Sequence, residues 1–346
     1  MKNKIIAVLI GLFSLTACSQ QPKTELKNPD MTNNKLTADN YVETMLREIK
    51  HYPQEPYYYI YIENSLCIYE ILINDVPMVK NFEYGEYATP FYINDAILRS
   101  GTQKITYRLY PAPPEYNGEN GDKFSKNTSF AIEVFVNDKA KKLPLGEEKL
   151  IKRENAARNT VMLGKDKDIK EEWFVAEGKE YYEASFTFDA QVPYEIEGWS
   201  KGQDLKKFDQ KELQKAVVNF YKTQWNVYNA KEKDAMFSYL YKREKEINQS
   251  KYESEEILKK MVKEYSLPFD NSTFQVEPLE NYKMVLYGDG KIVALIHTSI
   301  DSRLRGESMI WGKYKSDMGN TKASFRDYLL YLPEGKKLED GLEVIR

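Results

Sequence analysis

The strongest constraint on the fold is a change of hydrophobic periodicity near residue 205 of a chain of 346 residues. Before this point, short segments alternate apolar and polar residues between Asn, Asp, Gly and Pro, which is typical of antiparallel strands. After it, three segments repeat with the helical period, and strand-like segments follow. The pattern predicts an α+β chain with an N-terminal antiparallel β-sandwich over residues 37–204 and a C-terminal α+β domain over residues 205–346.

The first domain is predicted mainly from its strands. A short helix over 38–49, capped by Thr37, is expected to precede them. Residues 63–65 are expected to end the first strand, and a basic stretch at 150–159 is compatible with a helix. The predicted strands are 57–62, 66–73, 76–79, 104–110, 129–136, 172–175 and 181–189.

The second domain is predicted to begin with helices. Asp209 followed by Glu212 is a capping-box pattern, so a helix is expected to start there. Pro268 is expected to end the third helix, because proline has no N–H to donate. Gly288-Asp289-Gly290 separates two apolar runs and predicts a tight hairpin. The predicted helices begin after Asp209, near Glu232, and after Ser250 or Ser254, and the predicted strands are 273–276, 282–287, 291–298, 308–315 and 324–332.

The N-terminal segment has the layout of a secretory signal. Lys2 and Lys4 precede an apolar run over 5–15, and small residues stand just before Cys18. Crossing a bilayer takes about 20 apolar residues, so this run is too short for a transmembrane helix. Residues 1–17 are therefore predicted to be a signal peptide, and the polar residues 18–36 a flexible tether.

The residues Leu15-Thr16-Ala17-Cys18 resemble the lipobox of bacterial lipoproteins. The resemblance implies cleavage after Ala17, a diacylglycerol on the Cys18 sulfur and anchoring to a membrane of the cell envelope. Each buried methylene adds about 0.8 kcal/mol, so two or three acyl chains hold almost permanently. Ser19 in place of Asp implies the outer membrane, facing the periplasm or the surface, if the host is Gram-negative. The alternative is an ordinary signal peptide with a chance cysteine.

Cysteine content and charge narrow the environment and the partners. Cys18 and Cys67 are the two cysteines, so a lipid on Cys18 leaves no intrachain disulfide. Cys67 lies in an apolar run and is predicted to be a buried small hydrophobic residue. The net charge is −3 with both signs interspersed, so no nucleic-acid partner is predicted. The 27 tyrosines favour sheet-building, with a tyrosine-rich binding face as the alternative.

Two further segments carry resemblances. Ile73-Asn74-Asp75 and Ile97-Leu98-Arg99-Ser100-Gly101 resemble units of the sugar-binding β-sandwich modules of bacterial surface enzymes. Residues 229–235 resemble the helix-to-helix corner of the cone-shaped fold shared by nuclear transport factor 2 and bacterial pocket proteins. That fold places strands before its third helix, and this sequence shows none there.

The sequence lacks the spacings of common metal and catalytic sites. His51 and His297 are far apart, with no paired His or Cys motif, so no metal or cofactor is predicted. Residues 166–168 begin like a calcium loop but lack its Gly and distal Glu, and 117–122 is interpreted as a solvated loop rather than a calcium site. No nucleophile elbow or Ser-x-x-Lys motif set occurs. His51 is predicted to close the first helix, and His297 to lie in the core or at a pocket rim.

Trp199, Trp311 and His297 are the candidate ligand-binding residues, because tryptophan rings stack on sugars, whereas Trp173 and Trp225 are predicted to be core. The leading hypothesis is a non-catalytic binding or interaction lipoprotein with a protein, glycan or cell-wall ligand, an immunity-type protein being one version. One alternative is a glycan-active enzyme, which would place two carboxylates about 5–9.5 Å apart. The other is a structural subunit of an envelope assembly.

Overall fold

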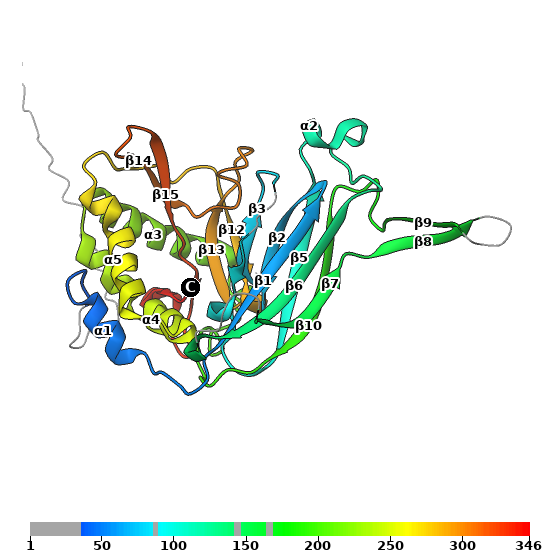
Figure 1. Ribbon diagram of the computed structural model, residues 1–346. Helices are drawn as coiled ribbons and strands as arrows, with labels where there is room; N and C mark the ends of the chain where they lie inside the picture. Colours follow the sequence, from blue (N-terminus) through cyan, green and yellow to red (C-terminus); the bar gives the residue numbers. More distant parts are fainter. Residues whose placement is uncertain (1–35, 86–88, 142–146, 164–168) are drawn as a thin grey trace, which may run out of the picture.

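The computed structural model describes residues 36–85, 89–141, 147–163 and 169–346 (Figure 1). Antiparallel sheets fill most of the first half of the chain, and helices open the second half. The predicted α+β class is therefore confirmed. The signal segment, Cys18, most of the tether and residues 166–168 lie outside the described residues. No helix in the described ranges is long and apolar enough to cross a membrane.

The first half contains two four-stranded antiparallel sheets (Figure 1). Apolar side chains from strands of both sheets share one core, which includes Ile60, Ile71, Leu109 and Ile132. One sheet has the order β4 (Phe91–Tyr92), β1 (Pro56–Ser65), β6 (Ser129–Asp138) and β7 (Lys149–Asn155). The other has the order β10 (Tyr182–Ala190), β5 (Gly101–Pro111), β2 (Cys67–Ile73) and β3 (Val76–Asn81).

The first strand is longer than predicted. β1 does not stop before residues 63–65, because it pairs with β6 as far as Ser65 opposite Ser129. The turn into β2 follows at once, and the Asn64 side chain stabilises it by donating to the Cys67 carbonyl (3.0 Å).

The helix expected at 150–159 is wrong, because these residues form strands. β7 is an edge strand, and β8 (Arg158–Leu163) pairs with β9 (Ile169–Phe174) in a hairpin that projects from the molecule (Figure 1). Side chains on both faces of β7 and β8 are exposed or half-buried. Neither strand therefore has a buried face, and the apolar alternation that normally reveals a strand is missing.

The second half opens with α3 (Gln210–Asn229), α4 (Lys233–Lys251) and α5 (Glu255–Asp270). Asp209 caps α3 as predicted, since its carboxylate accepts the Lys211 and Glu212 N–H groups (2.9 and 3.0 Å). The buried face of α3 includes the predicted apolar stripe and consists of Leu213, Val217, Phe220, Tyr221, Gln224, Val227 and Tyr228.

The third helix does not end at Pro268 as predicted. α5 runs two residues further, to Asp270, and the Asn271 N–H closes it by donating to the Leu267 carbonyl (3.0 Å). A proline in the last turn removes only one donor, so the helix tolerates it there.

α1 (Tyr41–Glu48) is shorter than predicted and packs far from its sequence neighbours. Asn40, not Thr37, is the N-cap, and the Thr37 hydroxyl accepts the Asn40 N–H (3.3 Å). The helix packs against α4 and α5, with Tyr41 fully buried. The Tyr41 hydroxyl donates to Glu244 (2.6 Å), which lies 203 residues away in the sequence.

The remaining strands all follow α5. One sheet has the order β11 (Gln275–Val276), β14 (Ile310–Lys315) and β15 (Thr321–Arg326). The other has the order β12 (Tyr282–Tyr287), β13 (Ile292–His297), β16 (Leu330–Tyr331) and β17 (Glu343–Val344). The predicted strand 324–332 is thus two strands in different sheets. Short helical turns lie in the connections: α2 (Pro114–Asn117), η1 (Asn94–Ala96), η2 (Gly118–Asn120), η3 (Lys139–Lys141), η4 (Leu205–Lys207), η5 (Gly288–Gly290) and η6 (Leu338–Asp340).

Candidate functional site

The structure places the predicted ligand-binding residues in two separate locations. His297, at the end of β13, lies against Trp311 of β14 with ring centroids 5.6 Å apart, and Trp311 stacks on Phe325. Both side chains are buried, and burial lowers the pKa of His297. Trp199 lies elsewhere, buried beneath the guanidinium of Arg346. Packing within the chain therefore covers most of both tryptophan rings.

Three other side chains that stand out in the sequence are Trp225, Trp173 and Cys67. Trp225 packs against the helical core and donates to the Glu277 carbonyl (2.9 Å), whereas Trp173 on β9 is only half-buried. Cys67 is fully buried, which confirms the prediction of a buried small residue, and burial raises the pKa of its thiol to about 12.

His51 and the loop at 117–122 are both held by contacts within the chain. α1 ends at Glu48, so His51 does not close the helix as predicted, and its Nδ1 lies 2.7 Å from a Glu55 carboxylate oxygen. The Asn117 side chain donates to the Gly121 and Lys123 carbonyls (2.8 and 2.6 Å) and so holds its own loop.

A cleft of about 700 Å³ lies where the strands of the first half meet those of the second. Its walls come from the turn between β2 and β3, the residues leading into β5, Trp199 with its neighbours, and the β12–β13 hairpin. Leu98 and Leu286 add apolar surface, and the rest of the lining is mostly polar. Such a volume is within the range of small-molecule sites.

Two tight turns build the cleft by meeting each other. Asn74 and Asp75 have φ values of 51° and 63°, and Asp289 has 57°, which are left-handed values that Asn, Asp and Gly tolerate in hairpin turns. The Asp75 carbonyl accepts the Gly288 N–H (3.0 Å), and the Asp75 carboxylate accepts the Asp289 N–H (2.8 Å). The two halves of the chain are therefore joined at this edge of the cleft by direct hydrogen bonds.

Basic side chains outnumber carboxylates around this cleft. Lys291 donates to the Ser200 carbonyl (2.5 Å), and Arg99 has only a distant, mostly exposed partner at 3.9 Å, which is worth little. Lys104 and Lys206 form no salt bridge with any residue that the structure describes. The basic lining residues are Arg99, Lys104, Lys206 and Lys291, and the acidic ones are Asp75 and Asp289.

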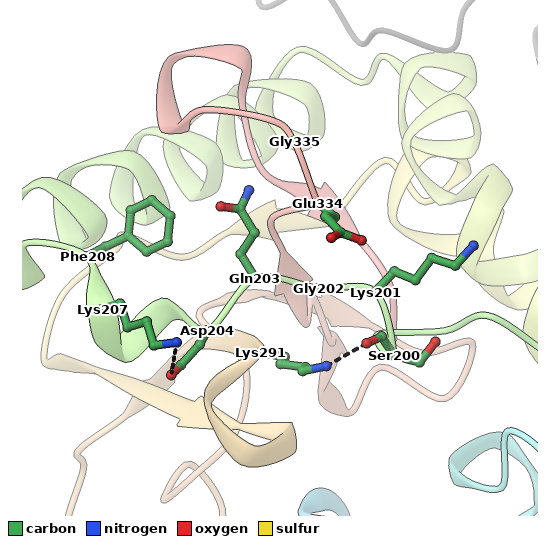
Figure 2. Close-up of a pocket in the computed structure, with 10 residues that line it drawn as sticks. All are labelled: Ser200, Lys201, Gly202, Gln203, Asp204, Lys207, Phe208, Lys291, Glu334 and Gly335. Carbon is green, nitrogen blue, oxygen red and sulfur yellow. Dashed lines mark hydrogen bonds and ion pairs between the residues drawn. The ribbon is translucent and has the colours of Figure 1, made fainter.

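A second pocket, of about 620 Å³, adjoins the cleft and shares Ser200 and Lys291 with it (Figure 2). It lies between the segment 200–208 and the turn at 334–335. Gln203 fixes these walls, because its side-chain amide donates to the Pro333 and Lys336 carbonyls (both 2.7 Å).

Figure 2 also shows the charged groups of this pocket. Lys207 pairs loosely with Asp204 (3.8 Å), and the Lys291 ammonium reaches the Ser200 carbonyl. Lys201 and Glu334 also line the pocket, and Lys201 pairs with Glu197 (3.2 Å). The linings of the two pockets together hold six basic side chains and four acidic ones: Arg99, Lys104, Lys201, Lys206, Lys207 and Lys291, with Asp75, Asp204, Asp289 and Glu334.

The side chains that line the two pockets offer charges and hydrogen-bonding groups to a ligand. No histidine or cysteine lines either pocket. Across the described ranges, no group of three or more His, Cys, Asp and Glu side chains is placed to hold a metal ion. The Ser200 hydroxyl donates to the Glu197 carbonyl, so it is held by backbone rather than by a base.

The sequence contains only part of the signal for this site. Asn74-Asp75 and 288–290 are visible as turns, and Arg99 and Ser100 as part of a turn unit, but nothing local indicates that the turns meet across 214 residues. The lysines belong to no motif. Comparison with known proteins gives no matching family model, no similar curated protein and no similar solved structure.

Proposed function

We propose that this chain is a lipid-anchored protein of the bacterial cell envelope that binds an acidic glycan in the basic cleft without catalysing a reaction. The observation that carries the proposal is the excess of basic side chains in the cleft, with Lys104 and Lys206 free of salt bridges among the described residues. Opposite charges attract across such a surface, and the attraction weakens as salt is added.

The position of two segments supports a glycan over other anions. The segments at 73–75 and 97–101 resemble parts of sugar-binding modules, and residues of both line the cleft. In line with this likeness, we propose that the two four-stranded sheets form a β-sandwich. Their shared apolar core supports that arrangement.

Calorimetric titration of the mature chain with oligosaccharides tests the binding. We expect uronic-acid oligomers to bind, neutral oligomers of equal length to bind at least tenfold more weakly, and added salt to weaken the acidic ligand. The double variant Lys206→Gln/Lys291→Gln should lose at least tenfold in affinity, which is about 1.4 kcal/mol. Lys222→Gln/Lys263→Gln removes two exposed helix lysines outside the cleft and serves as the matched control.

Two results would contradict this proposal. Equal affinity for acidic and neutral oligomers would remove the role of charge, and an unchanged Lys206→Gln/Lys291→Gln variant would remove the role of the cleft. If the chain cleaved a glycan and Asp75→Asn or Asp289→Asn abolished the cleavage, the protein would be an enzyme rather than a binding protein.

Metabolic labelling tests the anchor separately. We expect radiolabelled palmitate to enter the wild-type chain and not the Cys18→Ala variant, because the sulfur of Cys18 is the proposed attachment atom. An unlabelled wild type, or a variant labelled as strongly as the wild type, would refute the anchor and leave the cleft proposal standing.

A further inference from the structure

A second group of polar side chains lies inside the helical half and shares no residue with the cleft. Figure 1 shows α1, α3, α4 and α5 gathered at one end of the molecule, with β14 and β15 beside them. The group draws one or two residues from each of α3, α4, α5 and β15. Its members are Gln224, Tyr228, Arg243, Glu244, Tyr265 and Arg326.

Direct contacts join most of these residues into one cluster. The Arg326 guanidinium lies over the Tyr265 ring, 3.9 Å from its centroid, and the Arg326 Nε donates to the Tyr228 hydroxyl (3.3 Å). The Tyr265 hydroxyl donates to Glu244 (3.2 Å), and Nη1 of Arg243 lies 3.3 Å from the same carboxylate oxygen. Two guanidinium groups therefore flank one tyrosine and one carboxylate.

The negative charge in this cluster is already engaged. Glu244 is fully buried, and it also accepts a short hydrogen bond from the Tyr41 hydroxyl (2.6 Å). Among the described residues no carboxylate forms a salt bridge with Arg326, and the adjacent Asp327 is exposed. Arg243 thus pairs with the one buried carboxylate of the cluster, whereas Arg326 has no ion-pair partner among the described residues. A cation that is even partly buried without a counter-charge is costly.

Several buried donors and acceptors in the cluster are also unused. The Nε atom of Arg243 finds no hydrogen-bond partner in the described part of the chain, and its Nη1 has only the ion-pair contact with Glu244. The same holds for both amide atoms of Gln224, which has no exposed surface and stands one turn before Tyr228 on the buried face of α3. More than nine in ten buried polar groups are normally paired, so this concentration points to a ligand.

The cluster is also reachable and permanently charged. The side chains of Tyr265 and Arg326 are partly exposed, and that of Arg243 is 13% exposed. Burial pushes the pKa of Arg326 down, but the surrounding tyrosines outweigh it and raise that pKa, so the guanidinium stays protonated.

We propose that Arg243 and Arg326 form a binding site for a small oxyanion, a carboxylate or a phosphate, that enters beside Tyr265. Guanidinium groups match the geometry of such anions and bind them with charge-assisted hydrogen bonds. The anion would supply the missing negative charge. Gln224 lies on the same buried face of α3 as Tyr228, which Arg326 contacts, so its unpaired amide would bind a polar group attached to the anion. This site does not depend on the proposed glycan binding.

Thermal unfolding of the mature chain with added anions gives the first test. Sulfate, phosphate, acetate and succinate are compared with chloride at equal ionic strength. We expect at least one oxyanion to raise the melting temperature in a saturable way, while chloride does not, because only a specific site saturates. Preference for carboxylates would identify an organic acid as the ligand class, and preference for phosphate a phosphorylated one.

Variants locate the effect. Arg326→Gln should weaken the preferred anion at least tenfold, and Arg326→Lys should weaken it less, because lysine keeps the charge without the planar fork. Arg47→Gln, which removes an exposed guanidinium on α1, and the cleft variant Lys206→Gln/Lys291→Gln should bind as the wild type does. The cleft variant separates this proposal from the proposed function.

A crystal soaked in selenate gives a readout that needs no variant to fold. The anomalous signal of selenium should lie between Arg243 and Arg326. A peak only at the cleft lysines, no saturable stabilisation by any oxyanion, or unchanged binding in Arg326→Gln would each overturn the site.

Discussion

Replacing Tyr221 with Phe removes a hydroxyl that fills a break in the hydrogen bonding along one edge of β13. On one edge of β13, β16 pairs with Ile292 and Val293, and Ser308 pairs with Ile296. The Leu295 N–H falls between these partners and donates to the Tyr221 hydroxyl instead (3.1 Å). That hydroxyl in turn donates to the Tyr328 carbonyl (2.7 Å).

The expected loss follows from these two bonds. Tyr221, Leu295 and Tyr328 are all buried, so water does not replace the missing oxygen easily. A typical hydrogen bond contributes about 1 kcal/mol, and a buried group left unpaired costs about 1–3 kcal/mol. We therefore expect Tyr221→Phe to lower the free energy of unfolding by about 2–4 kcal/mol.

Urea denaturation and amide hydrogen exchange measure this effect. The urea midpoint should fall with an unchanged slope, and the Leu295 amide should exchange faster than its neighbours in β13. Tyr239→Phe is the matched control, because that hydroxyl has no hydrogen-bond partner among the described residues and its loss should cost less than about 0.5 kcal/mol. Equal losses in the two variants would refute the reasoning.

Two further predictions concern titrating groups. Because burial raises the pKa of Cys67 to about 12, a thiol reagent at pH 8 should label the folded chain far more slowly than the urea-unfolded chain, and equal rates would contradict the assigned burial. Burial lowers the pKa of His297, so as the pH falls this side chain is protonated in the unfolded chain at a higher pH than in the folded chain. The free energy of unfolding should therefore fall as the pH drops from about 7 to about 5. His297→Gln should flatten this dependence in urea midpoints measured across that range, and an unchanged slope would show that other groups cause it.

Local sequence patterns predicted several elements correctly and gave wrong predictions for others. Asp209 marks the start of α3 because the capping residue and its partners are sequence neighbours. β7 and β8 were not predicted as strands, because an exposed strand has no apolar face and so shows no alternation of apolar and polar residues. Pro268 was misleading because its cost depends on the position within the helix, which the sequence does not state.

The candidate site was less predictable than the fold. Asn74 and Asp75 are visible as a turn because they tolerate positive φ, yet the cleft depends on their meeting the 288–290 turn. Such a contact is set by packing of the whole chain and not by any local pattern. Trp199 and Trp311, which were singled out for stacking on sugars, are both buried, and Trp199 also lines the cleft. A large ring can serve packing and binding alike, and its sequence context does not distinguish the two roles.

The position of α1 determines how this protein can be divided. Because residues 36–49 cover α4 and α5, the structural unit that contains the helices is assembled from two distant stretches of the chain, with the strands of the first half inserted between them. A truncation that begins near residue 205 would expose the apolar surface that Tyr41 and Met45 now cover. Co-expressing residues 36–49 as a separate peptide, or fusing them ahead of residue 205 through a linker, is therefore the rational way to obtain this unit alone.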